Sequence, residues 1–332
     1  MPVKTRTKLF RRIRLAAIIL LAVVLVPYGF SRIASPWRRV SVHSNADVSV
    51  GHRDDSSLVI ACYNIAHGRG LATSNWQGGT AEERKTRLAE IADLLRNLDA
   101  DIVVLNEVDF DSSWSLSTNQ ARYLATQAGY PYWAEQRNLD FRVLNWKWRF
   151  GNAILSRYPI TEASVIDFPG FSSVETFLAG KKRGVDCTIA VNGVKLRILG
   201  VHFSHRSEVI RARSAEMITE ITSADTVPTI VAGDLNSSPT GFPNSQSDKD
   251  AGNAVDILDA SSLFQRRPEQ PPIDPAEMTF PADQPEWISD WILVPRNCHV
   301  LDYRVESSTL SDHRPVVAEL SMDLVGDTTA PR

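Results

Sequence analysis

The sequence contains a series of short, β-rich apolar runs, and most of these seven runs begin or end at or beside an acid, amide or imidazole side chain. These runs cover residues 58–64, 101–108, 151–160, 185–202, 229–236, 289–294 and 313–320. Runs of this length and composition are typical of buried strands. A chain with this pattern must bury several strands in sheets, which constrains its fold more than any other feature.

Amphipathic helices and a hairpin interrupt the strand series. Apolar side chains recur on one helical face in residues 82–99, and residues 206–222 fit a second helix. Within 185–202, Asn192-Gly193 suits a tight type I′ turn between two strands. Helices alternating with strands favour an α/β fold, and hairpins within the series favour mixed sheets over a purely parallel sheet. We therefore predict a mixed-sheet α/β sandwich.

The start of the chain carries a separate signal. Residues 15–30 are almost entirely apolar, with six basic residues before them and three after them. The excess of positive charge on the N-terminal side predicts that this end lies in the cytoplasm. The apolar run is slightly short for a membrane span and slightly long for a signal-peptide core, and no convincing cleavage site follows it. We therefore favour an uncleaved signal anchor over a signal peptide that is removed.

These features predict the domain organisation of a single-pass protein of the cell membrane, with its folded domain outside the cytoplasm. The predicted parts are a basic cytoplasmic N-terminus (1–14), a transmembrane anchor (15–30), a tether (31–55), the folded domain (56–323) and a flexible C-terminal tail (324–332). Nine basic residues and no acidic residue fall before residue 40, so the remainder has a net charge of about −12. Non-specific nucleic-acid binding needs many Lys and Arg contacts, which this acidic body supplies poorly unless a metal offsets its charge locally.

Polar side chains gather at six predicted strand ends. They are Asn64, Glu107, His202, Asp234 with Asn236, Asp290, and Asp312 with His313. Strand ends of this kind indicate one rim of convergent groups, which is where α/β proteins place their sites. Carboxylate and amide oxygens suit a hard cation such as Mg²⁺. Acids and imidazoles can activate water and hold the charge that develops on a phosphoryl group. This set of side chains therefore points to phosphoester hydrolysis.

Seven motifs in a fixed order resemble one protein family. They are YNIAHG (63–68), LNEVD (105–109), GNAILSRYP (151–159), VHFSH (201–205), GDLN (233–236), SDWIL (289–293) and SDHRPV (311–316). Together they resemble the endonuclease/exonuclease/phosphatase superfamily, which includes pancreatic-type deoxyribonuclease, abasic-site endonucleases, neutral sphingomyelinases and inositol-polyphosphate 5-phosphatases. The resemblance covers residues 58–321. It implies a deoxyribonuclease-I-like, four-layer α/β sandwich, with two mixed sheets face to face and helices on both outer faces.

The resemblance also implies a site for Mg²⁺ or Mn²⁺. Glu107 matches the principal metal-ligand Glu, and Asp312 matches a metal-site Asp. Asn64 matches the Asn that helps to hold metal and phosphate. Asn106 stands where many relatives have Gln, a similar amide, so this departure bears on subfamily assignment and not on catalysis.

The catalytic groups are implied by the same comparison. Asp234 resembles the Asp that orients or deprotonates the attacking water, and Asn236 beside it binds phosphate or water. His313 matches the His that contacts the scissile phosphate, and Asp290 resembles the Asp that holds its imidazole. His202 resembles a His that donates to a phosphoryl oxygen. The general base stays open between Asp234 and the Asp290–His313 pair.

Other residues are open to two interpretations. Arg183 lies near a position where relatives place a phosphate-contacting Arg, although the spacing is looser. His67 either lines the site or lies in a solvated loop. A group of aromatic residues forms either a wall for a lipid or aglycone, or the packed edge of the sandwich; its members are Trp146, Trp148 and Phe150, with Trp114 and Trp133 nearby in sequence. Because Trp is highly buried on average, we favour edge packing, with Trp146 and Trp148 as exceptions.

The sequence therefore predicts a metal-dependent phosphoric ester hydrolase, a phosphodiesterase that acts on a lipid headgroup or another membrane-associated substrate. An extracytoplasmic endonuclease or exonuclease acting on nucleic acid is the alternative enzyme. A catalytically inactive, membrane-tethered binding module is disfavoured because the expected metal and water-activating residues all remain. No protein partner is evident from the sequence.

Overall fold

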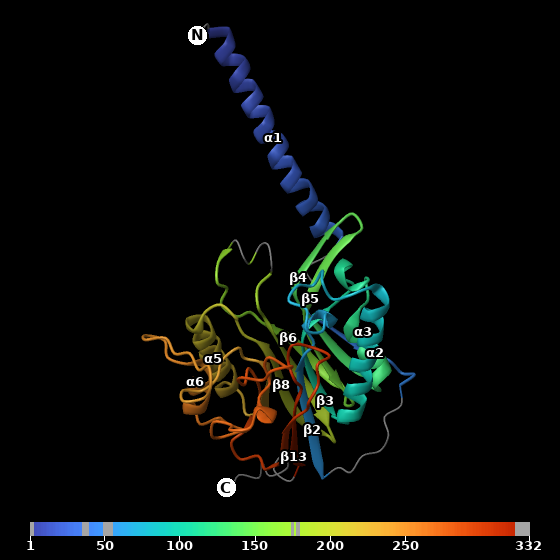
Figure 1. The fold of residues 1–332 in the computed structure, drawn as a ribbon, viewed down its shortest axis with the longest axis vertical. Helices are drawn as coiled ribbons and strands as arrows, with labels where there is room; N and C mark the ends of the chain where they lie inside the picture. Colours follow the sequence, from blue (N-terminus) through green and yellow to red (C-terminus); the bar gives the residue numbers. More distant parts are fainter. Residues whose placement is uncertain (1–2, 35–39, 49–55, 174–175, 177–179, 323–332) are drawn as a thin grey trace.

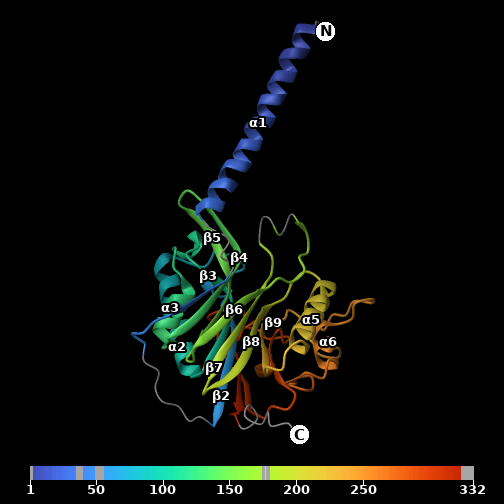
Figure 2. The same cartoon turned by 180° about the vertical axis from the view of Figure 1, so that it is seen from behind.

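The computed structural model describes residues 3–34, 40–48, 56–173, 176 and 180–322. Two mixed β-sheets pack face to face, and helices cover the outer face of each sheet (Figures 1 and 2). The predicted four-layer α/β sandwich is confirmed.

The first sheet has seven strands in the order β1-β4-β5-β3-β2-β13-β12. β2 and β3 are parallel, whereas the other neighbours in this sheet are antiparallel. The strands are β1 (Val40–Ser44), β2 (Ser57–Asn64), β3 (Ile102–Asp109), β4 (Tyr132–Val143), β5 (Trp146–Ser156), β12 (Val300–Val305) and β13 (Val316–Ser321).

The second sheet has six strands in the order β10-β11-β9-β8-β7-β6, and in it only the β8–β9 pair is parallel. The strands are β6 (Ile160–Ile166), β7 (Gly184–Val191), β8 (Val194–His202), β9 (Thr229–Asp234), β10 (Phe264–Arg266) and β11 (Asp290–Pro295). The β7–β8 hairpin turns at Asn192 and Gly193, with φ of 49° and 84°, as a type I′ turn requires.

The helices are α1 (Val3–Ala34), α2 (Ala81–Leu98), α3 (Gln120–Ala128), α5 (Glu208–Ser223) and α6 (Ala254–Ala260), with short 3₁₀ turns at Ala66–Gly68, Ser113–Ser115 and Pro275–Glu277. α2 begins at a capping box: the Thr80 hydroxyl accepts from the Glu83 backbone N–H, and the Glu83 carboxylate accepts from the Thr80 backbone N–H. α2 and α3 cover the first sheet, and α5 and α6 cover the second.

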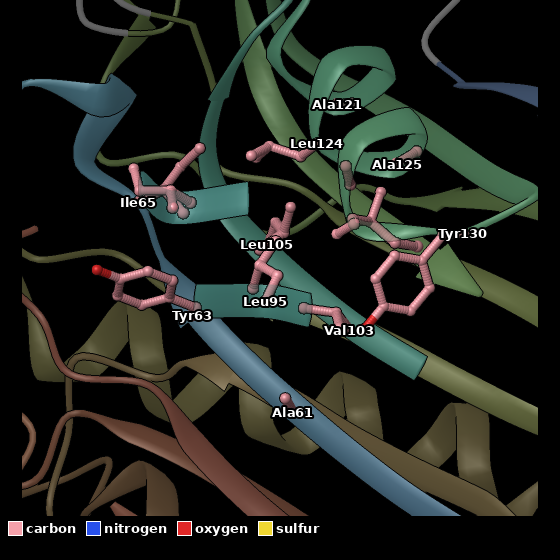
Figure 3. Packing of buried hydrophobic residues seen from close by; sticks show 14 of the residues in the cluster. Ala61, Tyr63, Ile65, Leu95, Val103, Leu105, Ala121, Leu124, Ala125 and Tyr130 are labelled. Atoms are coloured by element: carbon pink, nitrogen blue, oxygen red, sulfur yellow. The ribbon is translucent and has the colours of Figure 1, made fainter. Parts of the chain in front are cut away.

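β2 shows why the apolar runs contain so few polar residues. Successive side chains of a strand point to opposite faces. On one face Ala61 and Tyr63 pack against α2 and α3 (Figure 3), and on the other Ile60 and Cys62 enter the core between the two sheets. Because both faces are buried, the strand reads as a continuous apolar run.

The N-terminal segment differs from the prediction in two ways. α1 includes the basic start of the chain, and its stretch Phe10–Ser31 is long and apolar enough to cross a membrane. Within the expected tether, 31–55, Val40–Ser44 forms β1 and pairs with β4 at the sheet edge. Residues 35–39 and 49–55 and the predicted tail, 324–332, lie outside the described residues.

Candidate active site

Strands from both sheets end around one pocket of about 160 Å³. β2, β3, β8 and β9 all run toward this end of the sandwich, because each sheet has one parallel pair and the two pairs point the same way. The pocket is lined by Asn64, Arg69, Glu107, Lys182, His202, His205, Asp234, Asn236, Phe280, Trp287 and His313. Six of these residues were expected from the sequence.

Asp234 lies at the end of β9 and is only 1% exposed. Its Oδ2 accepts a hydrogen bond from Asn64 Nδ2 at 3.1 Å, and it lies 3.5 Å from His202 Nε2 and 3.9 Å from His313 Nε2. Its Oδ1 accepts from the Asn236 backbone N–H at 2.9 Å. Burial raises the pKa of the Asp234 carboxyl although the His313 charge opposes the rise. A carboxylate with a raised pKa, surrounded by imidazoles, is suited to accept a proton near neutral pH.

His313 is held from behind by Asp290. The His313 Nδ1 lies 2.9 Å from Asp290 Oδ2, which also accepts from the Ser289 hydroxyl at 2.7 Å. Burial alone would lower the pKa of the His313 imidazole, but the negative charges of Asp290 and Asp234 outweigh it and raise that pKa. The Phe280 ring lies 4.7 Å from the imidazole, centroid to centroid. The His313 imidazole is thus fixed with its Nε2 toward the pocket.

A second group of charges includes Arg69 and Glu107, which also line the pocket, and Asp312. Arg69 donates from Nη1 to Glu107 Oε2 at 3.2 Å and from Nη2 to Asp312 Oδ2 at 2.9 Å. Glu107 has a left-handed φ of 53° at an irregularity in the β3–β5 pairing, which lies between Leu105 and Val108. Such a bulge re-aims a side chain next to a site. One guanidinium therefore bridges the two carboxylates that were expected to bind metal.

The electrostatics of Glu107 reflect this position. Burial would raise the pKa of its carboxyl, but four basic side chains nearby lower it well below its usual range. In order of effect these neighbours are His67, Lys182, His202 and Arg69. The Glu107 carboxylate, which stays ionised, and the Asp312 carboxyl together offer oxygen ligands that suit a hard divalent cation. We conclude that Glu107 and Asp312 fit a metal ion, with Arg69 currently neutralising them.

Another set of possible ligand atoms fits a metal less well. Oxygens of Asp234 and Asp290 and a ring nitrogen of His313 lie within 4.8 Å of one another, and all three residues are buried. His313 Nδ1 and Asp290 are already hydrogen-bonded to each other, and Asp290 is 1% exposed. Magnesium keeps several waters when bound, and this dry pair leaves little room for them. The more exposed Glu107 and Asp312 suit it better.

His67 belongs to the site and does not lie in a solvated loop. It is 7% exposed, its Nδ1 lies 2.8 Å from Asp109 Oδ1, and its Nε2 lies 3.5 Å from Glu107 Oε2. Burial lowers the pKa of its imidazole, but Asp109 and Glu107 outweigh this and raise the pKa. His67 therefore lies between two carboxyl groups, Asp109 and Glu107, which favour its protonated form.

Lys182, rather than its neighbour Arg183, points into the pocket. Lys182 Nζ lies 2.7 Å from His202 Nε2 and 3.7 Å from a Glu107 carboxylate oxygen. Burial and the Lys182 charge lower the pKa of His202 well below its ordinary value, so this imidazole is neutral. The Arg183 guanidinium instead contacts Asp167 Oδ1 at 2.9 Å and the Asn138 carbonyl at 2.6 Å.

The structure thus brings together most of the residues expected from the sequence. Asp312 is connected to them through its contact with Arg69. Arg183, by contrast, points away from the pocket. Arg69 and Lys182 were not expected from the sequence. Arg69 directly follows the YNIAHG motif, and Lys182 precedes Arg183, so both lie next to segments that were expected to contribute to the site.

A mixed-sheet sandwich with this rim of acids, amides and imidazoles defines a phosphoesterase fold, and comparison with known proteins names its family. The endonuclease/exonuclease/phosphatase family matches residues 61–313, and the chain belongs to this family. Uncharacterized protein YbhP of Escherichia coli is 30% identical over 176 residues, which cover 48% of this chain and 63% of that protein. A relative with the same name and identity occurs in Shigella flexneri. The matched region thus spans less than two thirds of the length of these relatives.

Solved structures agree on the fold. An endonuclease/exonuclease/phosphatase from Beutenbergia cavernae has a TM-score of 0.57 at 18% identity, covering 80% of this chain and 72% of its own. Mannosyl-6-phosphatase Bt3783 of Bacteroides thetaiotaomicron has a TM-score of 0.57 at 18% identity, covering 79% and 99%. Truncated Caenorhabditis elegans TDP2 has a TM-score of 0.54 at 16% identity, covering 80% and 97%.

Proposed function

We propose that this protein is a divalent-metal-dependent hydrolase of phosphoric esters. The observation that carries the proposal is the meeting of Asp234, Asn64, His202 and His313 within one pocket that Glu107 also lines. The pocket holds a candidate proton acceptor, imidazoles for an anionic phosphoryl group and acidic ligands for a metal.

Asp234 is the group we assign to water activation. Its carboxylate is buried and has a raised pKa, and His202 and His313 lie on the same side of it. A water bound between these side chains would give its proton to Asp234 as it attacks the phosphorus. Asn236 would orient this water or a phosphoryl oxygen, because its backbone is fixed by Asp234.

The two imidazoles would hold the charge that develops on the phosphoryl oxygens. His313, whose pKa is raised, would do so as an imidazolium. His202, whose pKa is lowered, would be neutral, and its Nε2 would donate only after the Lys182 ammonium, which now donates to that nitrogen, has turned to the phosphoryl group. Asp290 would keep the His313 ring in place. Lys182 lies close enough to His202 to contact the same phosphoryl group.

The proposed metal is Mg²⁺ or Mn²⁺, held by Glu107 and Asp312, with Asn64 beside them. When bound, it supplies charge neutralisation at a phosphoryl oxygen and at the leaving oxygen. For the ion to enter, the Arg69 guanidinium must give up at least one of its two carboxylate contacts.

The proposed location is the cell membrane, with α1 as a single span and the catalytic domain outside the cytoplasm. The span Phe10–Ser31 supports the membrane location, and the six basic residues before its apolar stretch, 15–30, against three after it, support this orientation. A membrane-associated phosphodiester, such as a lipid headgroup, is the substrate class that suits this location. A nuclease acting outside the cytoplasm is the competing assignment.

A substrate panel tests the proposal. The full chain in nanodiscs would be incubated with DNA, RNA, sphingomyelin, phosphatidylinositols, sugar phosphates and an activated soluble diester, in Mg²⁺, in Mn²⁺ and in EDTA. We expect metal-dependent phosphate release or diester cleavage that stops in EDTA. Hydrolysis of none of these under any metal condition contradicts the proposal. Nucleic-acid cleavage that falls steeply with added salt selects the nuclease.

A further inference from the structure

Exposed apolar side chains gather at the end of the sandwich that holds the site. Trp76, in the loop after β2, is 61% exposed, and Leu144 and Trp146, in the β4–β5 turn, are 70% and 52% exposed. The Trp76 and Trp146 rings lie 6.3 Å apart, centroid to centroid. Clustered apolar exposure of this kind marks an interaction surface. We call Trp76, Leu144 and Trp146 the aromatic tip.

A series of edge-to-face and tilted ring contacts connects the aromatic tip to the catalytic pocket. Trp76 lies 6.1 Å from Trp114, which lies 5.9 Å from Phe150, and Phe150 lies 5.3 Å from His67. His67 in turn lies 3.5 Å from Glu107. Aromatic side chains thus run without a break from the exposed turn to a candidate metal ligand.

A second pocket lies beside this path. It has a volume of about 180 Å³, its lining includes Phe150, Pro169 and Phe171, and it shares Lys182 and His205 with the catalytic pocket. Its aromatic and proline side chains suit an apolar group whose attached phosphate is bound in the neighbouring catalytic pocket.

The aromatic tip also lies beside the end of the candidate membrane span. The Ser31 hydroxyl, at the last residue of that span, accepts a hydrogen bond from the Arg142 backbone N–H at 3.0 Å. Figures 1 and 2 both show α1 leaving the molecule next to the β4–β5 hairpin. If α1 crosses a bilayer, its end marks the membrane surface, and the hairpin turn lies at that surface.

The register of the strands places the site just behind the hairpin. Asp109 at the end of β3 pairs with Phe150, and the hairpin continues from there to the Val143–Trp146 pair. Four residues of strand span roughly 13 Å. If the β4–β5 turn enters the headgroup region by about 5–10 Å, most of this strand length lies within that region. The catalytic pocket would then lie roughly one lipid headgroup from the membrane surface.

We propose that the aromatic tip is a membrane-contact surface that turns the catalytic pocket toward the bilayer, so that the substrate is a phosphoester carried by a membrane lipid. The inference rests on the proposed anchor and hydrolase activity. Tryptophan is the residue that membrane proteins place at the water–bilayer interface. Arg142 and Lys147 flank the turn in sequence and suit anionic headgroups. Because the aromatic tip lies beside the end of α1, a bilayer is favoured over a protein as the partner that contacts it.

A depth measurement tests the surface without requiring activity. Spin labels would be placed on the full chain at Asn145→Cys, in the turn, and at Leu301→Cys, an exposed position on β12, both in a Cys298→Ser background. Cys62 and Cys187 are buried and should stay unlabelled. In nanodiscs of phosphatidylcholine and phosphatidylglycerol, we expect the label at 145 to collide more with oxygen than with a water-soluble nickel complex, and the label at 301 to do the reverse. Equal, water-like behaviour at both sites overturns the proposal, as does shielding of the label at 145 from both reagents.

An activity comparison tests the substrate. In the Leu144→Ser/Trp146→Ser variant we expect turnover of phospholipid in bilayers to fall by about tenfold or more, because the burial of two large apolar side chains is lost. Turnover of a soluble activated diester should not change, and Ile273→Ser, at a residue that is 97% exposed, should change neither. Equal loss on both substrates, or loss on neither, contradicts the inference. If the wild type cleaves no substrate, the hydrolase assignment fails, while the depth measurement still decides the surface.

Discussion

Asp290, the first residue of β11, and His313, in the loop before β13, form a buried pair, with Asp290 Oδ2 2.9 Å from His313 Nδ1. This contact leaves the other ring nitrogen, Nε2, facing Asp234 at 3.9 Å. An imidazole fixed in this way cannot turn its Nε2 away from the pocket. The pair therefore determines both the orientation and the charge of the imidazole.

Replacing Asp290 should change the pH dependence of the reaction. In Asp290→Asn the His313 imidazolium loses its main negative partner, so its pKa should fall. If the imidazolium holds phosphoryl charge, the alkaline limb of the kcat/KM profile should move to lower pH, and kcat should drop by about 10²-fold or more. Asp302→Asn, at an exposed ion pair, is the matched control. An unchanged profile would remove Asp290 from its positioning role.

The same pair should contribute to stability in a defined pH window. Because the pKa of His313 is raised in the folded state, its contribution is present below the ordinary imidazole pKa and is lost as pH rises through the folded value. Urea unfolding of wild type and Asp290→Asn at several pH values measures this. The difference in unfolding free energy should be largest on the acidic side of that window, and a difference that grows with pH contradicts the assignment.

Asp234 should be indispensable for turnover but not for folding. Asp234→Ala removes the proposed proton acceptor, and we expect a loss of at least about 10³-fold in kcat. Asp234→Asn keeps an oxygen that can accept from the Asn236 backbone N–H, so it separates that contact from the proton transfer. Circular dichroism should show a native fold for both variants. Turnover near the wild-type level in either variant would assign the base elsewhere.

Arg69 and the metal should compete for the same carboxylates. In Arg69→Met, Glu107 and Asp312 would repel each other without a cation between them. We therefore expect a lower melting temperature than the wild type in EDTA and a larger gain when Mg²⁺ is added. Arg96→Met, at an exposed ion pair on α2, is the control. An identical gain from Mg²⁺ in Arg69→Met and wild type would mean that the ion binds elsewhere.

The central strands could be predicted from the sequence because strands buried on both faces appear there as continuous runs of apolar residues. β2 and β9 are covered on both faces, and they were recognised within one or two residues. By contrast, β4 is a twelve-residue strand with mixed polarity, YWAEQRNLDFRV, and its outer half is only partly buried. β1 has a similar pattern and was assigned to a tether. Strands at a sheet edge, or projecting beyond the sheet, are stabilised mainly by hydrogen bonds to a neighbouring strand. Their sequences therefore show little hydrophobic periodicity from which a strand could be predicted.

The site shows the same division between local and tertiary information. Asp234 and His313 follow from strand ends and ordered motifs. Which of Lys182 and Arg183 enters the pocket depends on how the segment before β7 packs, and neither residue type nor spacing reveals that. The bridge from Arg69 to Asp312 joins residues far apart in sequence, so only the folded chain shows it.

Lys182 and Arg183 should therefore have different roles. Lys182→Met should lower kcat/KM by about tenfold or more without changing stability, because its side chain borders the pocket. Arg183→Met should lower the free energy of unfolding by about 1–3 kcal/mol, because Asp167 and the Asn138 carbonyl lose a donor. Steady-state kinetics and urea unfolding of the two variants measure this. The opposite pattern would place Arg183 on the phosphate.

Asn106 should couple stability to catalysis although it does not line the pocket. Its side chain is fully buried and joins the two sheets: Nδ2 donates to Asn152 Oδ1 and to the Val201 carbonyl, each at 2.9 Å, and Oδ1 accepts from the Asp234 backbone N–H at 2.9 Å. In Asn106→Leu these groups lose their partner inside a dry core. We expect a loss of about 3 kcal/mol or more of unfolding free energy.

Asn106→Gln separates the chemical from the steric requirement. The amide is kept but is displaced by one methylene, and Gly233 leaves no space for it, since a Cβ added there would lie 2.9 Å from Asn106 Oδ1. We expect a stability loss of about 1–3 kcal/mol, with the Asp234 backbone shifted. Because that shift moves the proposed base and not the phosphate-binding groups, kcat should fall while KM changes little. A variant that is destabilised but has wild-type kcat would show that the Asn106 amide supports the sandwich without aligning Asp234.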